Sequence, residues 1–176
     1  CKAMNQTLQA VVKSNPNLKI IFKELPIFGS DSQYAAKAAL ASVKQGKYYI
    51  FHDALLAADG PLTNTAVMEI AKKVGLDLGQ LKKDMASPDI TKELNANFQL
   101  AQQLKLMGTP SFVVANKQLT DFRFIPGAIS QESLQQQINA VTAVTTPAVN
   151  QNTQVNANIT VNNKNANAHN TTEVTH

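Results

Sequence analysis

Residues 108–119 read GTPSFVVANKQL, a short apolar run that is entered through a Thr-Pro step. Its β-branched and aromatic residues favour strand, and we expect two short strands, at 111–115 and at about 119–125. The periodicity that follows predicts an amphipathic helix at about 130–144. This end of the chain therefore predicts a small sheet closed by a helix.

The chain contains a single cysteine, and it is residue 1. One cysteine permits neither an intrachain disulfide nor a cysteine-based metal cluster within this chain. With three histidines and no clustered carboxylates, we expect no metal site. No signal peptide is visible, and because the chain opens on Cys rather than Met we expect that its targeting segment has been removed.

Between these two ends the pattern is mostly helical. An opening helix over 1–13 places Met4, Leu8 and Val11 on one face. Residues 18–25, LKIIFKEL, have the composition and length of a buried strand. Further helices, two of them with predicted N-caps at Thr63 and Ser87, are expected over residues 32–46, 47–58, 63–75, 77–86 and 87–107. Three strands make a thin sheet for this core, so part of the sheet is expected to be missing.

Composition limits the classes of function. The chain has 44% hydrophobic residues, a formal net charge of +4 and a pI of about 9.2. Lysines alternate with acids, no run of five like charges occurs, and no aromatic residues interrupt a basic stripe, so we expect no nucleic-acid binding. No apolar run is long enough to span a bilayer. Residues 145–176 are rich in Asn and Thr and are predicted to be a disordered tail.

Four short motifs occur in a fixed order along residues 1–142. They are CK at the start, IIFKELPIFG at 20–29, GTPSFVV at 108–114 and IPGAI at 125–129. Together with AAKAALASVKQGKYYIFHDALL at 35–56, they resemble the DsbA-like branch of the thioredoxin superfamily, and more closely the bacterial periplasmic thiol–disulfide oxidoreductases.

The resemblance implies an α/β, thioredoxin-like fold that lacks its N-terminal strand or strands. A discontinuous and incomplete thioredoxin-like domain is expected over residues 1–29 and 108–144, with a helical insertion domain at 30–107 and the disordered tail at 145–176. In the family a Cys-x-x-Cys motif opens a helix, and Cys1 matches its second, resolving cysteine. The first cysteine would then lie three residues upstream of Cys1, together with the strand that leads to it.

The same resemblance implies the chemistry. A thiolate attacks a disulfide, and a second thiol resolves the mixed disulfide that forms. A helix N-terminus stabilises the thiolate. The expected partners are extended secreted polypeptides and a redox partner that reoxidises or reduces the cysteine pair. We expect no cofactor beyond that redox-active pair, and a periplasmic or cell-envelope location in a bacterium.

Three further residues are candidates for the site. Thr109-Pro110 matches the family's cis-proline loop, which would lie against the cysteine pair and leave the backbone of Thr109 free to bind substrate. Standing alone, Pro110 is more simply interpreted as the start of an edge strand, but the order of the other motifs favours the cis-proline loop. Glu24 is a candidate general base for the resolving thiol, although an exposed Lys23–Glu24 pair at a strand end is the simpler interpretation.

Other interpretations remain. His52 could carry protons, but a packing role beside Asp53 is favoured. A non-catalytic thioredoxin-like module that binds peptides or serves as an envelope scaffold is the main alternative function. A lipoprotein with a lipid on Cys1 is disfavoured, because the opening helix begins at once without a flexible spacer.

Overall fold

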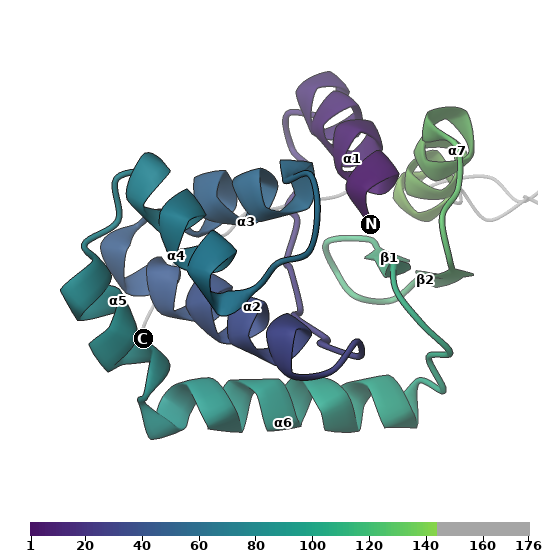
Figure 1. The fold of residues 1–176 in the computed structure, drawn as a ribbon. Helices are drawn as coiled ribbons and strands as arrows, with labels where there is room; N and C mark the ends of the chain where they lie inside the picture. The colour runs from purple at the N-terminus through teal and green to yellow at the C-terminus, as the bar shows by residue number, and fades with distance from the viewer. Residues whose placement is uncertain (144–176) are drawn as a thin grey trace, which may run out of the picture. The chain divides into compact units, whose positions relative to one another are not determined.

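Seven α-helices, one 3-10 helix and one two-stranded sheet form residues 1–143, the part of the chain that the computed structural model describes (Figure 1). The elements are α1 (Lys2–Ser14), α2 (Ser30–Ala41), η1 (Ser42–Gln45), α3 (Tyr48–Ala57), α4 (Asn64–Lys73), α5 (Leu78–Met85), α6 (Pro88–Gln103), β1 (Ser111–Ala115), β2 (Phe122–Pro126) and α7 (Gln131–Thr142). The predicted disordered tail lies outside the described residues.

Local sequence signals set most helix ends. The Thr63 hydroxyl accepts a hydrogen bond from the backbone N–H of Ala66 (3.2 Å), and Ser87 caps α6 just before Pro88. Both predicted N-caps are confirmed. The helix predicted over 32–46 is divided, because α2 ends at Ala41 and the chain continues as the 3-10 helix η1 up to Gly46.

One hydrophobic cluster lies among the helices α2 to α6, and we call it the helical cluster. Phe51, Val67 and Leu81 are fully buried in it. The remaining buried members are Ala35, Ala38, Ala39, Ala41, Leu55, Ala71, Leu76 and Ile90. Aliphatic side chains and alanines let the helices approach closely, so this core needs few aromatic rings.

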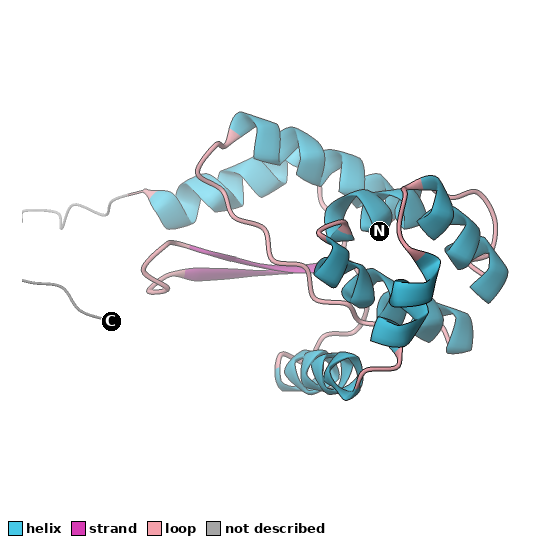
Figure 2. Ribbon diagram, turned by 90° about the vertical axis from the view of Figure 1, so that its left-hand side faces the viewer, coloured by secondary structure: helices cyan, strands magenta, loops and turns pink. Residues whose placement is uncertain are grey.

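A second cluster joins the two ends of the described chain, and we call it the sheet cluster. Its buried members are Met4 and Val11 from α1, Ile125 from β2, and Leu134 and Ile138 from α7. β1 and β2 pair antiparallel with Ser111 opposite Pro126, and Figure 2 shows this hairpin as the whole of the sheet in the described residues. The two clusters fall in the ranges expected for two domains, and the domain division itself stays a prediction.

The strand predicted over residues 18–25 is wrong. Leu18, Ile20, Phe22 and Glu24 are half-buried while the residues between them are exposed, which is the period-two pattern of a strand. Yet within the described part of the chain, residues 19–28 make no backbone–backbone hydrogen bond. A strand needs a neighbour to pair with, and among residues 1–143 no strand pairs with this segment, so it is drawn as loop in Figure 2.

The helical cluster predicts a large difference between two leucine truncations. Leu81 is fully buried, whereas Leu100 on α6 is 40% exposed. Leu81→Ala is expected to lower the free energy of unfolding by about 2–5 kcal/mol, because it removes buried methyl groups and leaves a cavity. Leu100→Ala is expected to cost less than about 1 kcal/mol. Urea unfolding measures both, and equal costs would show that the cluster is not the core.

Candidate functional site

Cys1 lies at the N-terminus of α1, where it is the N-cap residue. Its side chain is exposed and forms no capping hydrogen bond, while its carbonyl accepts the first backbone bond of the helix from Asn5 N–H (3.0 Å). The first N–H groups of a helix have no partner within the helix and carry partial positive charge. A thiolate at Cys1 would therefore lie in a favourable field.

Two neighbours hold α1 in place. Met4 and Val11 pack it against α7 and the sheet, while its polar side meets α3. The Lys2 ammonium donates to the carbonyl of Ala57 (3.1 Å) and pairs with Asp59 (3.0 Å). The next turns of α1 also bind α3, because the amides of Asn5 and Gln9 both donate to the carboxylate of Asp53. The position of the Cys1 backbone thus depends on both contacts.

Thr109 and Pro110 form the step into β1. Their peptide bond is cis, as the resemblance implies, and both residues are half-buried. Phe112, two residues on, packs against the sheet cluster, and so does Met4, one turn after Cys1. The helix that Cys1 begins and the strand that Thr109-Pro110 leads into therefore both contribute to the sheet cluster.

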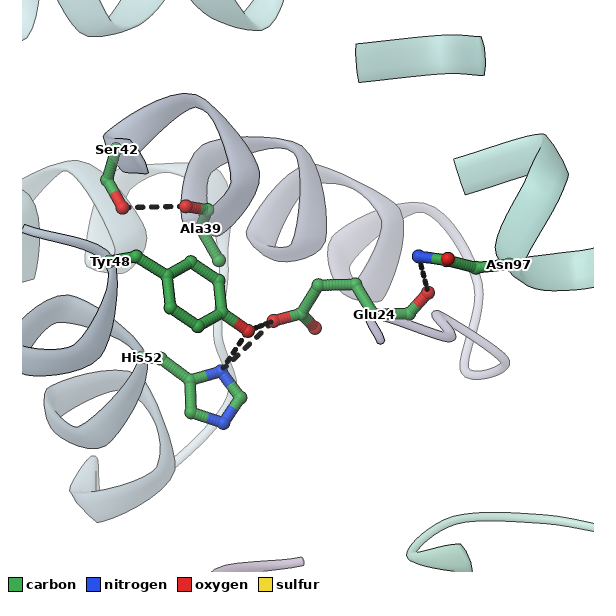
Figure 3. Close-up of polar contacts among 6 residues, drawn as sticks. All are labelled: Glu24, Ala39, Ser42, Tyr48, His52 and Asn97. Carbon is green, nitrogen blue, oxygen red and sulfur yellow. Dashed lines mark hydrogen bonds and ion pairs between the residues drawn. The ribbon is translucent and has the colours of Figure 1, made fainter. Parts of the chain in front are cut away.

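Glu24 belongs to a different set of contacts, shown in Figure 3. Its carboxylate Oε1 accepts a hydrogen bond from the Tyr48 hydroxyl (2.6 Å) and lies 3.0 Å from Nδ1 of His52. Its backbone carbonyl accepts from the Asn97 amide on α6 (3.1 Å). The side chains of Glu24 and His52 are each 16% exposed. We call Glu24, Tyr48 and His52 the carboxylate cluster.

Aromatic rings enclose the carboxylate cluster. The His52 ring stacks on Tyr48, with centroids 5.3 Å apart, and lies 4.8 Å from the ring of Phe22. Burial of the phenol, then the charge of Glu24, and then its hydrogen bond to that carboxylate raise the pKa of Tyr48 well above its ordinary value. Tyr48 thus keeps its proton and remains a donor to Glu24.

One of the simpler sequence interpretations does not match these contacts. Lys23 and Glu24 do not form an exposed pair, since Lys23 binds Glu93 on α6 (3.1 Å) and Glu24 turns towards α3. His52 packs against Phe22 and Tyr48, in line with the favoured packing interpretation, and its polar partner is Glu24, while Asp53 binds Gln9 of α1. Tyr48 was missed as a site residue. Tyr48 lies four residues before His52, so the two side chains share one face of the helix. That spacing was the sequence signal that could have linked Tyr48 to His52.

Comparison with known proteins identifies the family. Residues 1–139 match the model of the DSBA-like thioredoxin domain. The chain belongs to the DSBA-like thioredoxin domain family. Among curated proteins it is 31% identical, over 125 residues, to the probable disulfide bond formation protein D of Bacillus cereus. That match covers 65% of this chain and 58% of the relative, so the chain spans a little over half the length of this curated relative.

Solved structures agree with this DSBA-like assignment. A thioredoxin-like oxidoreductase from Silicibacter pomeroyi is 39% identical with a TM-score of 0.74, over 80% of this chain and 78% of that one. The thiol-disulfide exchange protein alpha-DsbA2 from Wolbachia pipientis is 25% identical with a TM-score of 0.71, over 81% of this chain and 75% of that one. The fold is thus the thioredoxin-like fold of the DSBA family.

The carboxylate cluster predicts how stability changes in alkali. Because the pKa of Tyr48 is raised in the folded state, the unfolded chain releases this proton first, at about pH 10. The contribution of Tyr48 to stability is therefore complete below about pH 10 and is lost as the pH rises further. Between about pH 9 and pH 11, the urea midpoint should fall more steeply in the wild type than in Tyr48→Phe. Identical slopes would contradict the burial and bonding of this phenol.

Proposed function

We propose that this chain is part of a protein thiol–disulfide oxidoreductase that exchanges disulfides with extended polypeptides. The observation that carries the proposal is the place of Cys1, at the N-terminus of the first helix of a DSBA-like domain. We further propose that Cys1 is the second, resolving cysteine of a Cys-x-x-Cys motif. Its first cysteine, the attacking one, would belong to the longer protein, three residues before Cys1.

The proposed exchange follows from thiolate chemistry. When the enzyme oxidises a substrate, a substrate thiolate attacks the enzyme disulfide, forming a mixed disulfide with the first cysteine and releasing Cys1 as a thiol. A second substrate thiolate then breaks the mixed disulfide. In the reverse direction Cys1 loses its proton, attacks the mixed disulfide and frees the substrate thiolate. A chain that holds Cys1 alone would not perform this cycle at a useful rate.

The unpaired backbone of residues 19–28 supports the proposed longer protein. In the described residues β1 pairs only with β2, so its other edge is also free. Unpaired strand edges are templates for strand pairing. A strand from the longer protein, leading to the first cysteine, would give both edges the partners that they lack here.

Thr109 and Pro110 are the proposed substrate-binding residues. The sheet pairing begins at Ser111, so the backbone of Thr109 lies outside the ladder with β2. An extended polypeptide could bind there through main-chain hydrogen bonds, which recognise a chain without reading its sequence. A redox partner that reoxidises or reduces the cysteine pair would bind at the same backbone position.

A periplasmic or cell-envelope location in a bacterium completes the proposal. No helix within residues 1–143 is both long and apolar enough to cross a membrane. The proposed substrates, secreted polypeptides, acquire disulfides in oxidising compartments such as the periplasm. The proposed enzyme needs no cofactor other than its cysteine pair.

Trapping tests the assignment of Cys1. In the full-length protein, Cys1→Ser should leave the first cysteine able to form a mixed disulfide but unable to resolve it. The variant should therefore accumulate covalent complexes with a substrate peptide, visible on a non-reducing gel, and turn over at least about tenfold more slowly. Replacing the upstream cysteine by Ser is the matched control and should give no complex. Wild-type turnover by Cys1→Ser would refute the assignment.

The alternative function, a non-catalytic module that binds peptides, predicts a different result. Such a protein would have Ser or Ala three residues before Cys1 and would bind an extended peptide without changing its thiols. An insulin-reduction assay on the full-length protein separates the two. Reduction at a rate that vanishes in both cysteine variants supports the enzyme, and absence of reduction with retained peptide binding supports the module.

A further inference from the structure

The hydrogen bonds of the carboxylate cluster determine where the protons lie. An ionised carboxylate only accepts hydrogen bonds, so both neighbours of Glu24 Oε1 must donate. The hydroxyl of Tyr48 donates to it at 2.6 Å and therefore has no second proton to give to His52, whose Nδ1 is 3.4 Å away. With Glu24 ionised, Nδ1 of His52, at 3.0 Å from its carboxylate, would be the ring nitrogen that carries the proton.

This arrangement leaves the other ring nitrogen of His52 as an acceptor. In a neutral imidazole with a proton on Nδ1, Nε2 has a free lone pair. Figure 3 shows Nε2 on the side of the ring that points away from Glu24. In the described residues no protein group bonds to it, and no polar side-chain atom is both buried and without a partner, so water reaches Nε2.

We propose that Nε2 of His52 accepts the proton that the Cys1 thiol releases, with Glu24 and Tyr48 as the residues that position the imidazole. This inference rests on the proposed function, in which Cys1 resolves a mixed disulfide. Glu24 was the expected general base for the resolving thiol. In this proposal His52 is the base, and Glu24 orients it through the contact with Nδ1. A carboxylate that orients a histidine so that its far nitrogen can take a proton is a recurring arrangement in nucleophilic catalysis.

The contact between α1 and α3 places His52 on the helix beside the Cys1 helix. Asp53, the next residue, binds the side chain of Asn5, which lies one turn after Cys1. Cys1 is exposed, so water reaches its thiol, and the proposal requires one or more waters between that thiol and Nε2. The thiol and the proposed proton acceptor thus belong to two helices that contact each other.

Other charged groups at this junction are already engaged. From α1, Lys2 is paired with Asp59, and from α3, Asp53 accepts two amide hydrogen bonds. The segment of residues 18–29 supplies Glu24, and its Lys23 pairs with Glu93. α2 and α4 meet α3 through the apolar helical cluster. Among these groups, the imidazole of His52 alone offers a nitrogen acceptor that no protein group in the described residues bonds to.

The proposed step balances simply. The proton of the Cys1 thiol passes through water to Nε2, and His52 becomes an imidazolium paired with the carboxylate of Glu24. The Cys1 thiolate forms a bond to the sulfur of the attacking cysteine, and the bond from that sulfur to the substrate breaks. The substrate leaves as a thiolate, and the imidazolium returns its proton to that thiolate or to solvent.

Nitrogen NMR of the full-length protein tests the geometry independently of activity. At a pH where His52 is neutral, the spectrum should show the tautomer with the proton on Nδ1, and Glu24→Gln should shift that population. A proton on Nε2 of the wild type would overturn the proposal, whether or not the protein is an enzyme. A proton on Nδ1 would support the proposed contact between Glu24 and His52 even if the protein showed no thiol–disulfide exchange.

Kinetics of the full-length enzyme test the role. His52→Asn keeps a donor near the position of Nδ1 and removes the basic nitrogen. It should slow the resolution of a pre-formed mixed disulfide by up to about a hundredfold and flatten the pH profile of that rate relative to the wild type. His169→Asn, the same change in a histidine outside the described residues, is the matched control and should leave the profile unchanged.

Two results would overturn the proposed role of His52. The first is a His52→Asn enzyme that resolves the mixed disulfide at the wild-type rate with the wild-type pH profile. The second is a slowed enzyme whose pH profile keeps the wild-type shape, since that pattern belongs to a structural role. Absence of exchange by the wild type would instead refute the proposed function, and with it any part of His52 in the exchange.

Discussion

The attachment of α1 on two sides is the constraint on which the proposed site depends. Met4 and Val11 bury its apolar face against α7 and the sheet, and Lys2, Asn5 and Gln9 bind α3. Apolar burial supplies most of the stabilisation, while the hydrogen bonds set the rotation of the helix about its own axis. Because Cys1 is the N-cap of α1, the position of its backbone follows from both contacts.

The second constraint is the pairing of strands. Residues 18–24 keep the alternating burial of a strand, with Phe22 and Glu24 turned towards α3, although residues 19–28 make no backbone–backbone bonds within the described part of the chain. Side-chain contacts therefore hold this segment in place. The carboxylate cluster and the ion pair between Lys23 and Glu93 are the polar part of that attachment. The same contacts that position Glu24 thus tie the segment to the helical cluster.

The sequence predicted the helices well because their signals are local. The caps at Thr63 and Ser87 depend on hydrogen bonds within three residues. The strand at 111–115 was also predicted correctly, since its partner β2 follows within the same hairpin. The strand predicted over residues 18–25 was wrong, because pairing depends on a neighbour that the local pattern does not supply.

The site was predictable only in part. The motif order indicated Cys1 and the Thr109-Pro110 step, which precede two elements of the sheet cluster, α1 and β1, and their roles stay predictions. The contact of Glu24 with His52, 28 residues apart in the sequence, was not predictable, because helical spacing reveals which face Tyr48 and His52 share but not what meets that face. Long-range contacts of this kind depend on how the segments are packed together.

Mapping of the disulfide in the full-length protein tests the central claim most directly. The protein would be oxidised, blocked at any remaining thiols, cleaved without reduction and examined by mass spectrometry. The account predicts a peptide in which Cys1 is bonded to a cysteine three residues before it, and loss of that bond after mild reduction. A free or lipid-modified Cys1 in the oxidised protein, with no cysteine at that upstream position, would contradict it.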